Sequence, residues 1–186
     1  MLPKLAAVAA LGFFALGPAL VQAAPSDSDW RELHKAVGGN LFKAEPLARP
    51  CFSVFNGKPV KPDHEKCAAV QESYRNGTIK TSSYPGFVHT YNEACASNVT
   101  DQCLLLPNDK LATGPCNQGI LSERYIAVTS AKDAQAAFHF ARRTGITLSI
   151  KATGHDYASR SSRKGSLALW TRNLNTLEKL LAVPKT

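Results

Sequence analysis

The sequence lacks the short motifs by which many enzymes are recognised. It has no Gly-x-Gly-x-x-Gly fingerprint, no P-loop, no Gly-x-Ser-x-Gly nucleophile elbow and no His-Glu-x-x-His zinc motif. These absences argue against Rossmann-type dinucleotide binding, P-loop nucleotide hydrolysis, α/β-hydrolase chemistry and zinc proteolysis. The sequence also has no internal repeats, which argues against a solenoid.

Long apolar runs are absent except near the amino terminus. Lys4 precedes an apolar run over residues 5–14, and the small residues Val21 and Ala23 suit signal peptidase. We therefore expect residues 1–23 to be a secretory signal peptide and the protein to be secreted. A membrane anchor is the weaker alternative, because this run is short for a span and no stop-transfer charges follow it. We expect no other contact with a membrane.

Cysteines are few and odd in number, and they suit an oxidising compartment. They occupy positions 51, 67, 95, 103 and 116. Two disulfides are plausible, with one cysteine left over. The sequence does not determine the pairing, so Cys51–Cys67 and a bridge among the last three cysteines are hypotheses. Asn76 and Asn98 each begin an Asn-x-Thr acceptor for N-glycosylation.

Acidic residues are scarce in the last third of the chain. Residues 24–120 hold ten Lys/Arg and ten Asp/Glu, whereas residues 121–186 hold eleven Lys/Arg and four Asp/Glu. This excess suits an anionic partner, although a solvated basic face explains it equally well. We expect no nucleic-acid partner, because the basic residues lack interleaved aromatic side chains.

The 186 residues, 44% of them hydrophobic and 19% charged, suffice for one core but not for two full-sized domains. The stretch of residues 26–39 predicts a short helix capped by Asp29, with Glu32 as its reciprocal partner, and with Trp30, Leu33 and Val37 on one face. Gly38 and Gly39 would end this helix. The rest of the segment to residue 119 predicts an irregular, disulfide-stapled region.

Regular structure is predicted most clearly from residue 124 on. Residues 124–129, 146–151 and 166–171 predict strands. Residues 130–145 predict a helix, with Ser130 as its cap, Asp133 in its first turn, Gly145 as its stop, and an apolar stripe of Ala134, Ala137, Phe138 and Ala141. The order strand–helix–strand–loop–strand implies a β-α-β unit with parallel strands.

The loop between the last two predicted strands carries the chemistry. Gly154 lacks a side chain directly before His155, so a bulky group can approach the backbone there. Successive backbone N–H groups in a turn form a nest for anions. The hydroxyls of Ser161 and Ser162 and the charge of Arg160 complete a predicted phosphate cradle without a helix amino terminus.

The segment from Ser122 to Asn175 resembles a known family. Its Thr-Gly-His-Asp-Tyr-x-x-Arg-Ser-Ser motif, followed by Ser-Leu-x-Leu-Trp, is similar to the start of the FAD-binding domain of the FAD-linked oxidases of the vanillyl-alcohol-oxidase and berberine-bridge-enzyme type. Fungal secreted members are the most similar, and the resemblance covers roughly residues 100–180. Leu104–Pro107 and Cys116–Gly119 resemble their leader more weakly. The implied fold class is α+β, an incomplete PCMH-type FAD-binding subdomain over residues 120–186 after an irregular, cysteine-containing region over residues 24–119.

The resemblance also implies roles for individual residues. His155 corresponds to the histidine that attaches to the flavin 8α-methyl group in covalent members. The loop that wraps the FAD pyrophosphate corresponds to Gly154, Asp156, Tyr157, Ser159, Arg160, Ser161 and Ser162. Lys151 stands where many members have Arg, and Ser159 stands where many have Gly.

The implied activity is an oxidation of a small-molecule substrate by FAD, with molecular oxygen as the final acceptor and hydrogen peroxide as a product. Fungal secondary metabolism is a reasonable setting by resemblance. Family members run to several hundred residues, so we expect this chain to be a truncated counterpart, and no catalytic residue is assigned. The alternative is a non-catalytic secreted glycoprotein that binds no flavin.

Other candidate sites are weaker. Asp63–Cys67 matches no zinc spacing, which favours a polar turn beside a disulfide, and we expect no metal site. His34, His89 and His139 are isolated histidines, and we expect His34 and His139 to be solvated. Trp170 is expected to pack in the core. Ser161 and Ser162 have no partner base in the sequence that would support a hydrolase.

Overall fold

The computed structural model describes residues 24–90, 93, 102–105 and 115–174. The predicted signal peptide, Cys95 and Asn98 lie outside these residues. Within the described ranges, no helix is long and apolar enough to cross a membrane.

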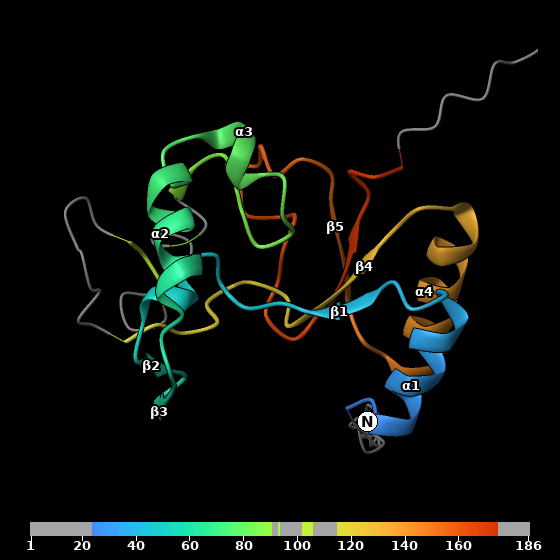
Figure 1. Ribbon diagram of the computed structural model, residues 1–186. Coiled ribbons are helices and arrows are strands. Elements are labelled where there is room, and N and C mark those ends of the chain that lie inside the picture. Colours follow the sequence, from blue (N-terminus) through green and yellow to red (C-terminus); the bar gives the residue numbers. More distant parts are fainter. Residues whose placement is uncertain (1–23, 91–92, 94–101, 106–114, 175–186) are drawn as a thin grey trace, which may run out of the picture.

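The described chain forms a four-stranded sheet, a two-stranded hairpin and several helices (Figure 1). The elements in chain order are α1 (Asp27–Ala36), β1 (Leu41–Lys43), the 3-10 helix η1 (Arg49–Cys51), β2 (Val54–Phe55), β3 (Lys58–Pro59), α2 (His64–Ser73), α3 (Gly77–Lys80), β4 (Arg124–Ala127), α4 (Ala131–Thr144), β5 (Leu148–Lys151) and β6 (Leu167–Trp170).

The larger sheet has the strand order β1-β4-β6-β5. Strands β4 and β5 both run parallel to β6, which lies between them, so the predicted parallel orientation is confirmed. The helical connection places β4 and β5 two positions apart, and β6 fills the gap. Strand β1 pairs antiparallel with β4, with Leu41 opposite Ile126, so the segment before residue 119 contributes an edge strand. The predicted boundary between the two regions stays a prediction.

Helices α1 and α4 cover one face of this sheet, side by side (Figure 1). Their core with the strands consists of Leu33, Val37, Leu41, Ile126, Val128, Ala137, Phe140, Leu167 and Leu169. The predicted stripe of α4 is wrong at one position, because Phe138 is 53% exposed whereas Phe140 is 3% exposed. Phe138 and Phe140 both lie near the expected apolar face of α4. Contact with α1 decides which of them is buried, because the Phe140 ring lies 4.8 Å from that of Trp30.

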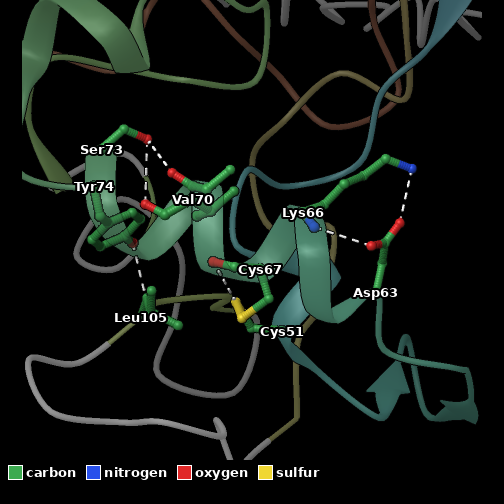
Figure 2. Close-up of a disulfide and its surroundings, with 9 residues drawn as sticks. Cys51, Asp63, Lys66, Cys67, Val70, Ser73, Tyr74 and Leu105 are labelled. Atoms are coloured by element: carbon green, nitrogen blue, oxygen red, sulfur yellow. Dashed lines mark hydrogen bonds and ion pairs between the residues drawn. A yellow bond between two sulfur atoms is a disulfide. The ribbon is translucent and has the colours of Figure 1, made fainter.

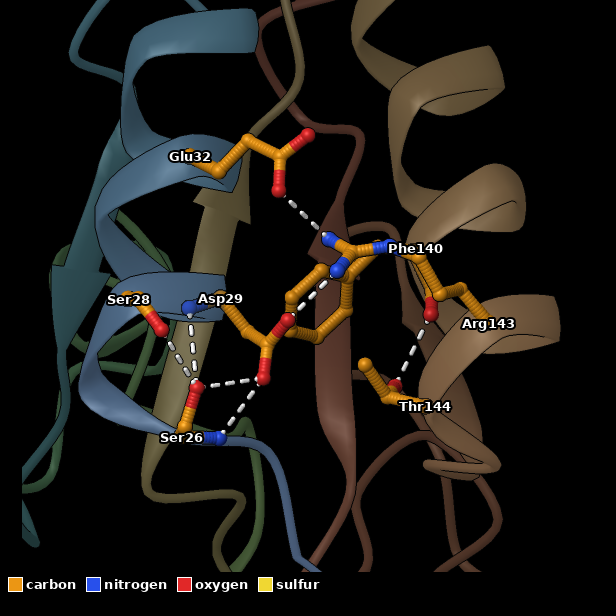
Figure 3. A network of polar contacts seen from close by, with 7 residues as sticks. All are labelled: Ser26, Ser28, Asp29, Glu32, Phe140, Arg143 and Thr144. Carbon is orange, nitrogen blue, oxygen red and sulfur yellow. Dashed lines mark hydrogen bonds and ion pairs between the residues drawn. The ribbon is translucent and has the colours of Figure 1, made fainter.

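The predicted cap of α1 is also wrong. The N-cap is Ser26, whose hydroxyl accepts from the Asp29 N–H, and Asp29 accepts in return from the Ser26 N–H at 2.9 Å. Asp29 is therefore the reciprocal partner of the capping box. Glu32 instead joins Asp29 in binding Arg143 of α4, at 3.0 Å and 2.5 Å (Figure 3). Leu33 and Val37 are buried as predicted.

The opposite face of the sheet is covered by irregular chain. Ala168 and Trp170 of β6 pack with Tyr84 and Phe87, which lie in the segment after α3. Trp170 is 7% exposed, which confirms its predicted place in the core. All four β6 residues are buried, because this central strand is covered on both faces.

A third cluster is built around two disulfides. Cys51 bonds Cys67, as hypothesised (Figure 2), and Cys103 bonds Cys116. The polar turn expected at residues 63–67 is instead the start of α2, where the Asp63 carboxylate caps the helix by accepting from the Lys66 N–H at 3.0 Å. Weak amphipathicity hid this helix in the sequence. The described residues contain no group of three or more potential metal ligands.

Candidate functional site

The candidate site is the loop of residues 152–166, which connects β5 to β6. Because these strands are parallel and adjacent, the loop must travel back along the sheet, and it does so without a helix. One side of the loop lies on the segment that follows α3. The Val88 N–H donates to the Gly154 carbonyl at 3.1 Å.

Lys151, the last residue of β5, holds the start of this loop against the segment that follows α3. Its side chain is fully buried, and its ammonium group donates to the carbonyls of Tyr84 and Gly86. Burial, followed by the nearby charge of Arg172, lowers the pKa of Lys151 to about 7. Lys151, predicted as a cofactor-binding residue, thus lies beneath the loop and fixes the chain segment on which the loop packs.

Gly154 is required by both conformation and space. Its φ is +88°, and a Cβ there would lie 2.7 Å from Lys151 Cε and 3.1 Å from the Gly86 carbonyl oxygen. Ser159 also lies in the left-handed region, with φ of +55°. The position at which many members of the resembling family carry glycine is therefore one where glycine relieves strain.

Asp156 organises the turn between these two positions. Its carboxylate accepts from the Ala158 N–H at 2.9 Å and from the Ser161 N–H at 2.7 Å. Desolvation raises the pKa of Asp156, but the donated hydrogen bonds outweigh it, so the pKa lies below its ordinary value. The carboxylate is ionised at neutral pH and serves the loop itself.

Three of the four serines in the loop differ in their surroundings. The Ser162 hydroxyl is buried and accepts from the Ser122 N–H at 2.9 Å. The Ser161 side chain hydrogen-bonds the Asp156 carboxylate. The hydroxyl of Ser159 is withdrawn from solvent and has no hydrogen-bond partner among the described residues. The Arg160 side chain is exposed beside it. Of these three hydroxyls, that of Ser159 is left to bind an added acceptor.

Three aromatic rings meet at the exposed side of the loop. The His155 and Tyr157 rings lie 5.6 Å apart, and both residues are exposed. The His89 ring stacks on Tyr157 at 4.2 Å and meets the His155 ring edge-on at 5.5 Å. Sequence reasoning missed this contact with His89, because 66 positions separate the two histidines and no local motif links them.

The predicted residues thus lie in the loop or directly before it. His155, Tyr157 and Arg160 are exposed, whereas Lys151 and Ser162 are buried. Comparison with known proteins gives this arrangement a context. The FAD-linked oxidoreductase OXR2 of Pyricularia oryzae is 63% identical over 85% of this chain and 29% of its own length. The FAD-linked oxidoreductase cheF of Chaetomium globosum is 46% identical over 86% of this chain and 27% of its own length.

This chain is a homologue of the FAD-linked oxidoreductases. A solved structure agrees, since the VAO-type flavoprotein MtVAO713 from Myceliophthora thermophila superposes with a TM-score of 0.68 at 26% identity. That match covers 86% of this chain and 26% of the flavoprotein. No protein-family model matches the chain. The predicted family and the α+β fold class are confirmed, and the chain spans less than a third of the length of these relatives.

The residues of the loop suit the FAD that these names imply. The unpartnered hydroxyl of Ser159 is a donor that a phosphate oxygen would satisfy. Arg160 adds a compensating charge. His155 presents an exposed imidazole. The expected open approach to the Gly154 backbone is wrong, because Gly154 is buried against Lys151 and Gly86. The roles of the individual residues remain predictions.

Proposed function

We propose that this chain supplies the pyrophosphate-binding loop of a flavoprotein oxidoreductase and that His155 is the site of covalent flavin attachment. The observation that carries the proposal is the loop itself: an exposed histidine next to a glycine of positive φ, followed by the unpartnered hydroxyl of Ser159 and the exposed Arg160. This combination supplies a nucleophile and anion donors within one turn.

Each loop residue has a distinct part in this proposal. The Ser159 hydroxyl donates to a phosphate oxygen, while Arg160 compensates the phosphate charge. Asp156 holds the turn in place through its bonds to the backbone N–H groups of Ala158 and Ser161. Bound FAD would supply hydride acceptance from a small-molecule substrate and reoxidation by molecular oxygen, with hydrogen peroxide released.

In its neutral form His155 would form a bond from an imidazole nitrogen to the flavin 8α carbon, with loss of the imidazole N–H bond and of one C–H bond of the methyl group. The two protons and the electron pair would pass to the flavin, and molecular oxygen would take them up as hydrogen peroxide. An imidazole nitrogen with a free lone pair is a nucleophile at neutral pH. Among the described residues, no hydrogen bond occupies either ring nitrogen of His155, so the lone pair is available.

The secretory signal over residues 1–23 and glycosylation at Asn76 and Asn98 belong to the same proposal. Asn76 is exposed, and its amide oxygen caps α3. A place in fungal secondary metabolism is also part of it.

Mass spectrometry of the denatured, trypsin-digested native protein tests the proposal. The informative peptide is Ala152–Arg160, because trypsin cuts after Lys151 and Arg160. We expect this peptide to carry one FAD and expect His155→Ala to abolish the attachment. Flavin that stays covalently bound in His155→Ala would refute the assignment. A protein without any flavin would favour the alternative, a non-catalytic glycoprotein.

A further inference from the structure

His89 is the member of the three-ring cluster that lies outside the loop. It follows the Tyr84–Val88 segment, and its ring contacts both His155 and Tyr157. The planes of His89 and Tyr157 differ by 27°, whereas those of His89 and His155 differ by 78°. One imidazole therefore stacks on the phenol and presents its edge to the other imidazole.

The position of His89 relative to the loop is fixed by contacts on both sides of Gly154. Lys151 binds the carbonyls of Tyr84 and Gly86. The Val88 N–H then bonds the Gly154 carbonyl, directly before His155. This hydrogen bond joins the residue before His89 to the residue before His155. The two histidine rings therefore lie side by side where the two chain segments meet.

His155 has little else to hold its orientation. Its side chain is exposed, and among the described residues its ring nitrogens have no hydrogen bond. An exposed side chain of this kind samples several rotamers unless neighbouring groups restrict it. Tyr157 is itself 61% exposed, so it offers a fixed surface only if another group supports it.

We propose that His89 is a positioning residue for His155. Its ring supports Tyr157 by stacking and confines His155 by an edge contact, so that the nucleophilic imidazole keeps one orientation at the tip of the loop. The role in attachment rests on the proposed function, whereas the orienting contact does not depend on flavin. The ring carries the effect, because His89 Nε2 is buried and has no hydrogen-bond partner in the described part of the chain.

The first test is NMR of the histidine ring protons in the flavin-free protein. We expect the His155 resonances to be displaced by ring currents in the wild type. They should move to the position of a free imidazole in His89→Ala and remain displaced in His89→Phe, which keeps an aromatic ring. His139→Ala is the matched control, since His139 is an exposed histidine on α4.

The second test measures covalent incorporation of FAD into the peptide Ala152–Arg160 of the same variants over time. We expect incorporation to be about tenfold slower in His89→Ala, because misplacing a reacting group by about 1 Å can cost about 100-fold and a smaller displacement costs less. His89→Phe and His139→Ala should stay close to the wild-type rate. Circular dichroism of each variant confirms that it is folded.

The outcomes separate this inference from the proposed function. Unchanged His155 resonances in His89→Ala would overturn the inference, as would equal effects of His89→Ala and His89→Phe. His89→Gln restoring the wild-type rate would also overturn it, because that result assigns the effect to a polar group. If the wild-type protein never carries flavin on this peptide, the proposed function fails while the NMR result still decides the role of His89.

Discussion

At the scale of single residues, the loop separates into groups that face outward and groups that support it from below. His155, Tyr157 and Arg160 are exposed, whereas Lys151 and Ser162 are buried. The motif in the sequence marked all of these residues as one cofactor-binding set. Burial divides them, because a fully buried ammonium group bound to two carbonyls serves the fold, and only exposed or unpartnered groups are left for a ligand.

Lys151 makes a prediction about pH. Its pKa in the folded protein is lowered to about 7 from an ordinary 10.5. Between these values the unfolded chain binds more protons, so the free energy of unfolding should rise with pH by up to about 1.4 kcal/mol per unit. Urea denaturation between pH 7 and 9.5 measures this slope, and Lys151→Met should remove most of it.

The exposed Lys132 of α4 provides the control for this experiment. Lys132→Met should leave the slope as in the wild type. The test uses the slope rather than the stability itself, because Lys151→Met also leaves two carbonyls without their donor. A slope that persists unchanged in Lys151→Met would show that Lys151 stays protonated in the folded protein, held by the nearby charge of Glu93 and the two carbonyls.

At the scale of elements, α4 is the best-specified part of the chain. Ser130 caps it, and Gly145 ends it with φ of +69°, as predicted. Asp133 does more than the sequence indicates. Its carboxylate accepts from the Thr129 N–H at 2.9 Å, the Ser130 N–H at 3.0 Å and the Thr129 hydroxyl at 3.0 Å. It therefore fixes the angle at which β4 leads into α4.

We expect Asp133→Ala to lower the free energy of unfolding by about 1 kcal/mol, because it leaves the partly buried donors of Thr129 and Ser130 without their acceptor. Asp133→Asn should recover part of the loss, because its amide oxygen still accepts. The hydrogen bonds lower the pKa of Asp133 despite desolvation, so the wild type should lose this stability as the pH falls through the lowered pKa. Urea denaturation at pH 7 and pH 3 measures both effects. Equal stability of Asp133→Ala and the wild type at pH 7 would contradict the prediction.

At the scale of the whole molecule, the sheet joins two helices on one face to an irregular layer on the other. Beside it, the disulfide cluster packs around Cys51, Cys67, Cys103 and Cys116. The Cys116 segment also forms a bridge to Phe55 of β2. Irregular chain in such a cluster forms few backbone hydrogen bonds between strands. The disulfides therefore contribute much of its stability.

Each disulfide should contribute about 3 kcal/mol, since the closed loops contain roughly 15 residues. Together they approach the total stability of an ordinary domain, about 5–15 kcal/mol. We expect reduction to shift the urea midpoint strongly downward. Replacing Cys51 and Cys67 jointly by Ser should give about half of this shift. A midpoint that does not respond to reductant would contradict the expected role of the bridges.

The sequence by itself determined the features that depend on neighbours along the chain. These are the strands β4, β5 and β6, the cap and stop of α4, the loop with its glycine and histidine, and the family resemblance that comparison confirms. Strands β1, β2 and β3 were not predicted. The insertion of β6 between β4 and β5, the choice of Phe140 over Phe138, and the contact of His89 with His155 were decided only by the tertiary structure. Each joins residues distant in sequence, and local propensity carries no record of which surfaces will meet when the chain folds.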